Sequence, residues 1–287
     1  MRALPLLALT LCLAGCDFDD FDGGRRVQED FHQSHALKPG GKVEVENFNG
    51  SVEIIGWEKD QVEINGTKYA PTQSLLSMMK VEITATADSV RVRVVKPDFR
   101  RGNMGAKMTI QVPRKVELER IVSSNGSLKA TDVEGPVRMR TSNGTVRVSK
   151  LLGSLDASTS NGAIEVRDFK GDSTLHTSNG RISADSIRGG LNVSTSNGAI
   201  DAQFVDVQSS RGMRFQTSNG AITLRLPSST NARLSASTSN STVSTDFDLV
   251  VKGGEISKRR MSGQLGSGGG PSIDISTSNG HIRVLKL

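Results

Sequence analysis

The tripeptide Ser-Asn-Gly recurs along this 287-residue chain, and its spacing constrains the fold more than any other feature. Its asparagine returns at every eighteenth position four times in succession, and the later intervals are longer and unequal. The series comprises Asn125, Asn143, Asn161, Asn179, Asn197, Asn219, Asn240 and Asn279. A repeat of this length is one supersecondary unit that must stack on its neighbours to bury its apolar face. The spacing therefore predicts a stack of equivalent coils.

Within each repeat, apolar residues alternate with polar ones. Leu155, Ala157 and Thr159 stand two apart, and the alternation resumes at Ile164 and Val166. A period of two is typical of strands with one buried face. The asparagine keeps the parity of the buried residues, so we expect it to point inward at a corner. The glycine after it is expected to allow a positive φ at the bend.

This parity favours an all-β parallel solenoid, or β-helix, of about 18-residue coils with a β-rich N-terminal cap. Stacked coils lie about 4.8 Å apart, which brings identical side chains into ladders. The predicted structural corner ladder consists of Asn125, Asn143, Asn161, Asn179, Asn197, Asn219 and Asn279. Because Asn-Gly between strands is also a hairpin signal, an antiparallel β-sandwich stays open as the alternative. Aromatic residues make up 4% of the chain, which fits a thin core.

The beginning of the chain carries an export signal. Residues 1–15 read as a lipoprotein signal peptide, with Arg2 before an apolar run too short to span a bilayer. The run ends in Leu-Ala-Gly-Cys, which resembles the bacterial lipobox, so Cys16 is the predicted lipid attachment site. Cys12 would be lost with the signal peptide, and the mature chain would have no disulfide.

The rest of the chain divides by pattern. Residues 16–36 show no sustained period and are predicted to be a flexible tether, residues 37–115 a β-rich cap region, and residues 116–287 the solenoid, with an irregular insertion at 246–271. The last repeat runs to Leu287, which predicts an open sheet edge and self-association.

No recurring constellation for catalysis is present in the repeat. Carboxylates that could serve a polysaccharide-processing enzyme are Asp132, Asp156, Asp168, Asp185 and Asp201, which fall in different columns of the repeat. The histidines His32, His35, His176 and His281 are scattered. We therefore expect no enzyme activity, no cofactor and no metal site. The formal charge is +6, but few aromatic residues accompany the basic groups, so we expect no nucleic-acid binding.

The repeats Thr-Ser-Asn-Gly-x-Ile, the opening Val-Glu-Asn-Phe-Asn-Gly-Ser-Val and the ending Ser-Thr-Ser-Asn-Gly-His-Ile-Arg-Val resemble the bacterial "putative adhesin" β-strand-repeat family, over about residues 40–287. This resemblance implies an exported all-β domain of unknown function without established catalytic residues. Asn240-Ser241 departs from the repeat.

These expectations combine into one functional hypothesis. The chain is predicted to be a lipid-anchored protein of the bacterial cell envelope, facing the periplasm or the cell exterior, with a structural or adhesin-like binding role. The candidate partners are the membrane, a polysaccharide, peptidoglycan, an envelope protein and a second copy of the chain. The alternative is a polysaccharide-processing enzyme on a β-helix scaffold. The choice between inner and outer membrane stays open.

Overall fold

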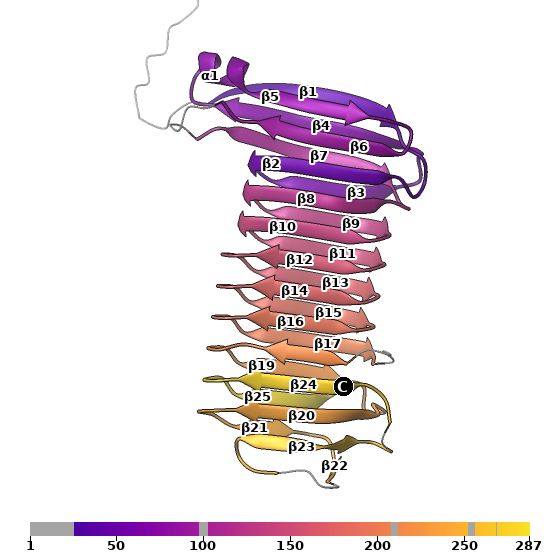
Figure 1. Cartoon of the computed structure of the whole chain (residues 1–287), viewed down its shortest axis with the longest axis vertical. Helices are drawn as coiled ribbons and strands as arrows, with labels where there is room; N and C mark the ends of the chain where they lie inside the picture. Colours follow the sequence, from indigo (N-terminus) through magenta and orange to yellow (C-terminus); the bar gives the residue numbers. More distant parts are fainter. Residues whose placement is uncertain (1–25, 98–102, 208–211, 252–255, 268) are drawn as a thin grey trace, which may run out of the picture.

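The structure is a computed structural model, and it describes residues 26–97, 103–207, 212–251, 256–267 and 269–287. In these ranges the chain forms two long β-sheets that face each other along one axis (Figure 1). The predicted signal peptide, Cys16 and residues 17–25 of the predicted tether lie outside the described residues.

The first sheet has twelve strands in the order β1-β4-β7-β3-β9-β11-β13-β15-β17-β19-β25-β21. Their bounds are β1 Val27–Ala36, β3 Val52–Trp57, β4 Gln61–Ala70, β7 Gly105–Pro113, β9 Leu128–Glu134, β11 Val146–Leu152, β13 Ile164–Lys170, β15 Ile182–Arg188, β17 Ile200–Asp206, β19 Ile222–Leu226, β21 Val243–Thr245 and β25 Ile282–Lys286.

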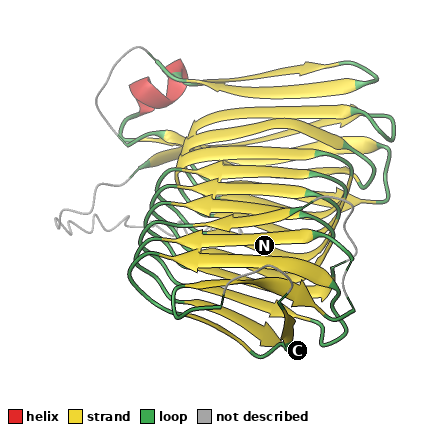
Figure 2. Cartoon of the chain, turned by 60° about the horizontal axis from the view of Figure 1, so that its bottom comes forward, coloured by secondary structure: helices red, strands yellow, loops and turns green. Residues whose placement is uncertain are grey.

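The second sheet has thirteen strands in the order β22-β23-β20-β24-β18-β16-β14-β12-β10-β8-β2-β6-β5. Their bounds are β2 Lys42–Asn49, β5 Lys80–Ala85, β6 Ser89–Val95, β8 Glu117–Asn125, β10 Val137–Asn143, β12 Leu155–Thr159, β14 Ser173–Thr177, β16 Leu191–Thr195, β18 Met213–Gln216, β20 Ala232–Thr238, β22 Leu249–Val250, β23 Arg260–Leu265 and β24 Ser272–Thr277. The helix α1 spans Gln73–Met78 and packs at the N-terminal end of the stack (Figure 2).

Each regular coil contributes one strand to each sheet, and successive coils pair in parallel. Ile164 of β13 stands opposite Val146 of β11 on one side and Ile182 of β15 on the other. Each residue therefore pairs with the residue one repeat earlier and one repeat later, and equivalent positions of the repeat lie above one another. The parallel solenoid predicted from the sequence is confirmed, and the antiparallel sandwich is excluded as the architecture of the repeat region.

The core is a narrow band between the sheets, filled by the alternating apolar residues. On β14, Leu175 and Thr177 are fully buried, while His176 between them is exposed. Larger rings enter where the repeat loosens: Phe204 and Phe215 meet edge to face, with ring centroids 6.3 Å apart. Because most core residues are aliphatic, burial is repeated coil by coil, and each coil depends on its neighbours for cover.

The N-terminal end departs from the repeat. Strands β2 and β3 stack in parallel on β8 and β9, as a divergent first coil, while β4 pairs antiparallel with β7 and with β1. The prediction of a flexible tether reaching residue 36 is therefore wrong for the stretch Val27–Ala36. This stretch is ordered because every one of its residues pairs with Gln61–Ala70, which satisfies its backbone hydrogen bonds on one side.

The C-terminal coil does not lie at the end of the stack. Strands β24 and β25 insert between β18 and β20 in one sheet and between β19 and β21 in the other. The predicted open edge at the last repeat is therefore wrong, because coils lie on both sides of it. The insertion at 246–271 carries β22 and β23, and β23 pairs antiparallel with β20. This excursion explains the long interval between Asn240 and Asn279, which are nevertheless neighbours in space.

Candidate functional site

The repeated asparagines form one continuous hydrogen-bonded column at a corner of the solenoid. Nδ2 of Asn161 donates to Oδ1 of Asn143 over 2.9 Å, and Asn179 donates to Asn161 in the same way. The column continues through Asn197, Asn219 and Asn279 to Asn240, so it follows the spatial order of the coils rather than the sequence order. At the other end, Asn143 donates to Asn125.

The predicted inward orientation of these asparagines is wrong. Asn161 and Asn179 are exposed, as are the other asparagines of the column. The strand alternation ends at the preceding threonine, where β12 stops at Thr159 and β14 at Thr177. The chain turns after that residue, so parity no longer predicts direction. The amides stack on the outside of the corner, where the ladder is accessible to solvent.

The inward residue at this corner is a threonine, and its hydrogen bond to the neighbouring coil was not predicted from the sequence. Thr177 is fully buried, and its Oγ1 donates to the carbonyl oxygen of Gly162, one coil back, over 3.0 Å. The same bond is made by Thr141, Thr159, Thr195, Thr217, Thr238 and Thr277. The alternation of two in the sequence does predict that these threonines point inward, because each has the parity of the apolar residues before it.

The glycine of Ser-Asn-Gly is required by close approach, not by a positive φ. A Cβ on Gly180 would lie 1.8 Å from the carbonyl oxygen of Gly162, and one on Gly198 would lie 1.7 Å from that of Gly180. Both glycines have backbone angles outside the positive-φ region. The expectation that this glycine serves a left-handed bend is therefore wrong for these coils.

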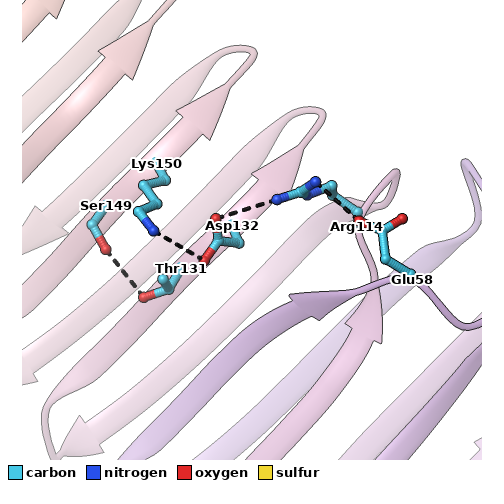
Figure 3. Close-up of polar contacts among 6 residues, drawn as sticks. All are labelled: Glu58, Arg114, Thr131, Asp132, Ser149 and Lys150. Carbon is cyan, nitrogen blue, oxygen red and sulfur yellow. Dashed lines mark hydrogen bonds and ion pairs between the residues drawn. The ribbon is translucent and has the colours of Figure 1, made fainter.

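A second repeated corner begins within the last residues of strands β9, β11, β13 and β15 of the first sheet, and this one does need positive φ. Asp132, Lys150, Asp168 and Ser186 have φ between 50° and 59°, and Gly153, shortly after Lys150, has φ 150°. The Asp132 carboxylate lies between two cations: Arg114 Nη2 at 3.4 Å and Lys150 Nζ at 3.9 Å (Figure 3). These exposed pairs contribute little stability, and they display alternating charge along the corner.

The outer face of the second sheet carries a run of three surface hollows. They have volumes of about 640, 250 and 490 Å³. The first and second share Arg138 and Asp156, and the second and third share Thr174 and Asn192, so the three are continuous. We call this surface the trough. It runs across the strands, parallel to the axis of the stack.

In the middle of the trough, three neighbouring strands present short side chains. The outward side chains that line it on β12, β14 and β16 are Asp156, Ser158, Thr174, Asn192 and Ser194. Longer side chains stand at both ends of this stretch, Arg138 and Arg140 on β10 and Arg214 and Gln216 on β18. These long side chains line the first and third hollows themselves, so the trough is bordered by short residues in its middle and by long ones toward its ends.

A sequence profile of the family described as Toastrack DUF4097 matches residues 41–285, which is most of the chain. The chain belongs to this family. The match covers the repeat region and all of the cap after the first strand, so the resemblance drawn from the Thr-Ser-Asn-Gly repeats is confirmed. No curated protein matches the chain.

Solved structures similar to this Toastrack chain share little sequence with it. One, described as a "putative lipid binding protein" from Parabacteroides distasonis, is 12% identical, with a TM-score of 0.48, 91% of this chain covered and 97% of that one. Another, described as a "putative adhesin" from Bacteroides fragilis, is 13% identical, with a TM-score of 0.42, 89% of this chain covered and 97% of that one.

The five candidate carboxylates do not converge in the Toastrack fold. Asp156 stands on the second sheet, where Arg138 Nε lies 3.6 Å from its Oδ2. Asp185 and Asp201 stand on neighbouring strands of the first sheet, and Arg225 pairs with Asp201. Asp132 and Asp168 both belong to the second corner and are two repeats apart, so the expectation that all five fall in different columns is wrong for this pair. The carboxylates are thus distributed over different faces, and salt bridges engage three of them, Asp132, Asp156 and Asp201.

The histidines are dispersed as well. Nδ1 of His176 lies 2.8 Å from Oγ of Ser194 in the trough, while Nδ1 of His32 lies 2.7 Å from Oδ1 of Asn65 in the cap. His35 lies on β1 and His281 follows the last Ser-Asn-Gly. Within the described ranges no three His, Cys, Asp or Glu side chains come together as metal ligands would. The same ranges contain no helix long and apolar enough to cross a bilayer.

Proposed function

We propose that this Toastrack chain is a lipid-anchored protein of the bacterial envelope whose role is structural or adhesin-like, exerted by binding through the outer surface of the solenoid. The observation that carries the proposal is the continuous column of hydrogen-bonded asparagines. Hydrogen-bonded ladders at the Ser-Asn-Gly corner link every coil from Asn125 to Asn240, which holds the outer side chains in fixed rows. A rigid, repetitive surface suits an extended partner better than a small substrate.

The anchoring part of the proposal rests on the sequence. Cys16 after Leu-Ala-Gly fits lipid attachment, and stable attachment to a membrane requires more than one acyl chain, which lipoprotein modification supplies. The described body begins at Arg26, a short stretch of chain after Cys16. The N-terminal end of the stack would then face the membrane, and the coils would project from it.

The enzyme alternative rests on one observation: Asp185 and Asp201 stand on neighbouring strands of one face. Glycoside hydrolysis requires one carboxyl group to be protonated while the other is ionised. Arg225 pairs with Asp201, whose register partner on β15 is Ser183 rather than Asp185, and Asp185 is exposed to solvent. We therefore favour binding over catalysis. Release of reducing ends from a polysaccharide by the wild-type chain, abolished in Asp201→Asn, would establish the enzyme instead.

The proposal is tested by expressing the full chain and its Cys16→Ser variant in a bacterium with a lipoprotein pathway. We expect the wild type in the membrane fraction, with a mass increase from acyl chains, and the variant released from it. Wild-type protein extracted in mild detergent should also retain envelope material on a column. A soluble, unmodified wild type would overturn the anchor, and a blank column would overturn the binding role.

A further inference from the structure

We infer that the trough on the second sheet is the binding site for an uncharged polysaccharide chain that lies along the axis of the solenoid. This inference rests on the proposed binding role and names the partner and its place. The trough is lined from Glu44 on β2 to Asp274 on β24. At about 4.8 Å between strands, the eight strands concerned span about 34 Å, which is long enough for several sugar units.

The chemistry of the floor is that of hydroxyl recognition. Ser158, Thr174, Asn192 and Ser194 offer hydroxyl and amide groups that both donate and accept. They stand in two rows, because Asp156, Thr174 and Asn192 are register partners in successive strands, as are Ser158, His176 and Ser194. A polymer that runs along the axis would therefore meet a polar group at each coil.

Charge argues against a polyanion. Six carboxylates line the three hollows, those of Glu44, Glu117, Glu119, Asp156, Asp172 and Asp274, whereas four arginines do so, Arg120, Arg138, Arg140 and Arg214. The surface is thus net negative although the chain as a whole carries +6. Nucleic acids and densely anionic polymers would be repelled by the carboxylates rather than attracted.

A peptide or a lipid is also a poor fit. A peptide that binds by strand addition needs a free sheet edge, and the trough crosses strands that are already paired on both sides. None of the residues lining the three hollows has a phenyl, phenol or indole ring, and the exposed large apolar side chains of the described ranges, such as Leu152 and Ile256, lie elsewhere. The apolar residues that do line the hollows, such as Leu155 and Val193, are buried in the core, so they offer an acyl chain little surface.

The opposite sheet provides a contrast and a control. On its outer face long charged residues pair across strands: Lys129 Nζ lies 2.7 Å from Glu53 Oε1, and Arg147 Nε lies 3.0 Å from Glu165 Oε2. Ser183 occupies a position on β15 equivalent to Thr174 on β14, pointing outward from the first sheet. A substitution at Ser183 therefore repeats the chemical change without touching the trough.

The test uses the purified full-length chain in mild detergent and affinity electrophoresis in gels containing dextran, a soluble β-glucan, hydroxyethyl cellulose or alginate. We expect at least one uncharged polysaccharide to retard the wild type at physiological salt. Filling the trough with Thr174→Lys and Asn192→Lys should weaken binding at least tenfold, whereas Ser183→Lys should leave it unchanged. Circular dichroism and thermal unfolding verify that each variant is folded.

The outcomes separate this inference from the proposed function. If the wild type retains envelope material but no uncharged polysaccharide retards it, the trough assignment is wrong and the binding role stands. Retardation by alginate alone, lost at high salt, would also overturn the trough assignment. So would binding of wild-type strength by the variant that carries Thr174→Lys and Asn192→Lys. If the wild type retains nothing, the proposed function itself fails.

Discussion

Nδ2 of Asn179 donates a hydrogen bond to Oδ1 of Asn161 across 2.9 Å, and the two residues occupy the same place on the exposed corner of adjacent coils. The same amide of Asn179 accepts from Asn197, so each interior asparagine joins two neighbours. The ladder aligns neighbouring coils. Because both asparagines are exposed to solvent, each hydrogen bond between them contributes only modestly to the stability of the fold. Its stability contribution can be measured one position at a time.

Asn179→Ala removes two of these bonds, and Asn125→Ala at the start of the column removes one. A net hydrogen bond contributes about 1 kcal/mol, and solvent can replace the lost partner here. We expect Asn179→Ala to lower the free energy of unfolding by about 1–2 kcal/mol and Asn125→Ala by about half of that, measured by urea denaturation. A loss of about 4 kcal/mol at Asn179 would indicate a buried amide and contradict the exposed ladder.

Thr177→Val removes the buried hydroxyl that donates to the Gly162 carbonyl and keeps the shape of the side chain. The carbonyl is then left without this donor, so we expect a loss of about 1–3 kcal/mol in unfolding free energy. Thr174→Val, on the exposed side of the same strand, is the matched control and should change stability by less than about 0.5 kcal/mol. Equal effects at the two positions would refute the role of the inward threonine.

Gly180→Ala tests the close approach of stacked corners. The added methyl group would lie 1.8 Å from the Gly162 oxygen, so the coils must separate. We expect a loss above about 4 kcal/mol, or failure to fold at about 37 °C. Gly263→Ala, whose methyl group would have its nearest neighbour at 3.2 Å, should be far milder in the same thermal unfolding experiment. A well-folded Gly180→Ala variant would show that the corner can open at little cost.

Lys150→Gly addresses the left-handed corner. Lys150 has φ 52°, a conformation that costs a non-glycine residue about 1–2 kcal/mol. Glycine relieves this strain but loses more entropy on folding, so we expect a gain of up to about 1 kcal/mol. Arg167→Gly, in an extended stretch of β13, should instead lose about 0.5–1 kcal/mol. Opposite signs in urea denaturation support the assignment, and a loss at both positions contradicts it.

The burial of Tyr69 should make the stability of the fold depend on alkaline pH. Burial raises the pKa of its phenol above 10.0, and the positive charge of Arg26 opposes part of that rise. The unfolded chain therefore ionises first, so the contribution of this residue to stability is complete below pH 10 and is lost as the pH rises through the folded-state pKa. We expect Tyr69→Phe to reduce the fall in melting temperature between about pH 9.5 and 11. Identical pH profiles for the variant and the wild type would exclude this coupling.

The sequence alone determined the coil length and the apolar columns, because four equal intervals combine with an alternation of two. It favoured parallel stacking, but only the structure excluded the antiparallel sandwich. Residues such as Leu175 and Ile182 lie where that alternation predicts. The family resemblance followed from the same repeats. Strand β1 was missed, because its alternation is weak and its partner β4 comes only after β2 and β3 in the chain.

Only the tertiary structure decided which way the corner residues face, since the chain turns between Thr177 and Asn179 and local parity ends there. It also decided that the C-terminal coil inserts between β18 and β20, because nearly identical coils can stack in more than one order and the pattern of one coil does not say which neighbour it meets. The trough arose in the same way. Its short side chains are ordinary surface residues in sequence, and they form a surface only when the coils place them side by side.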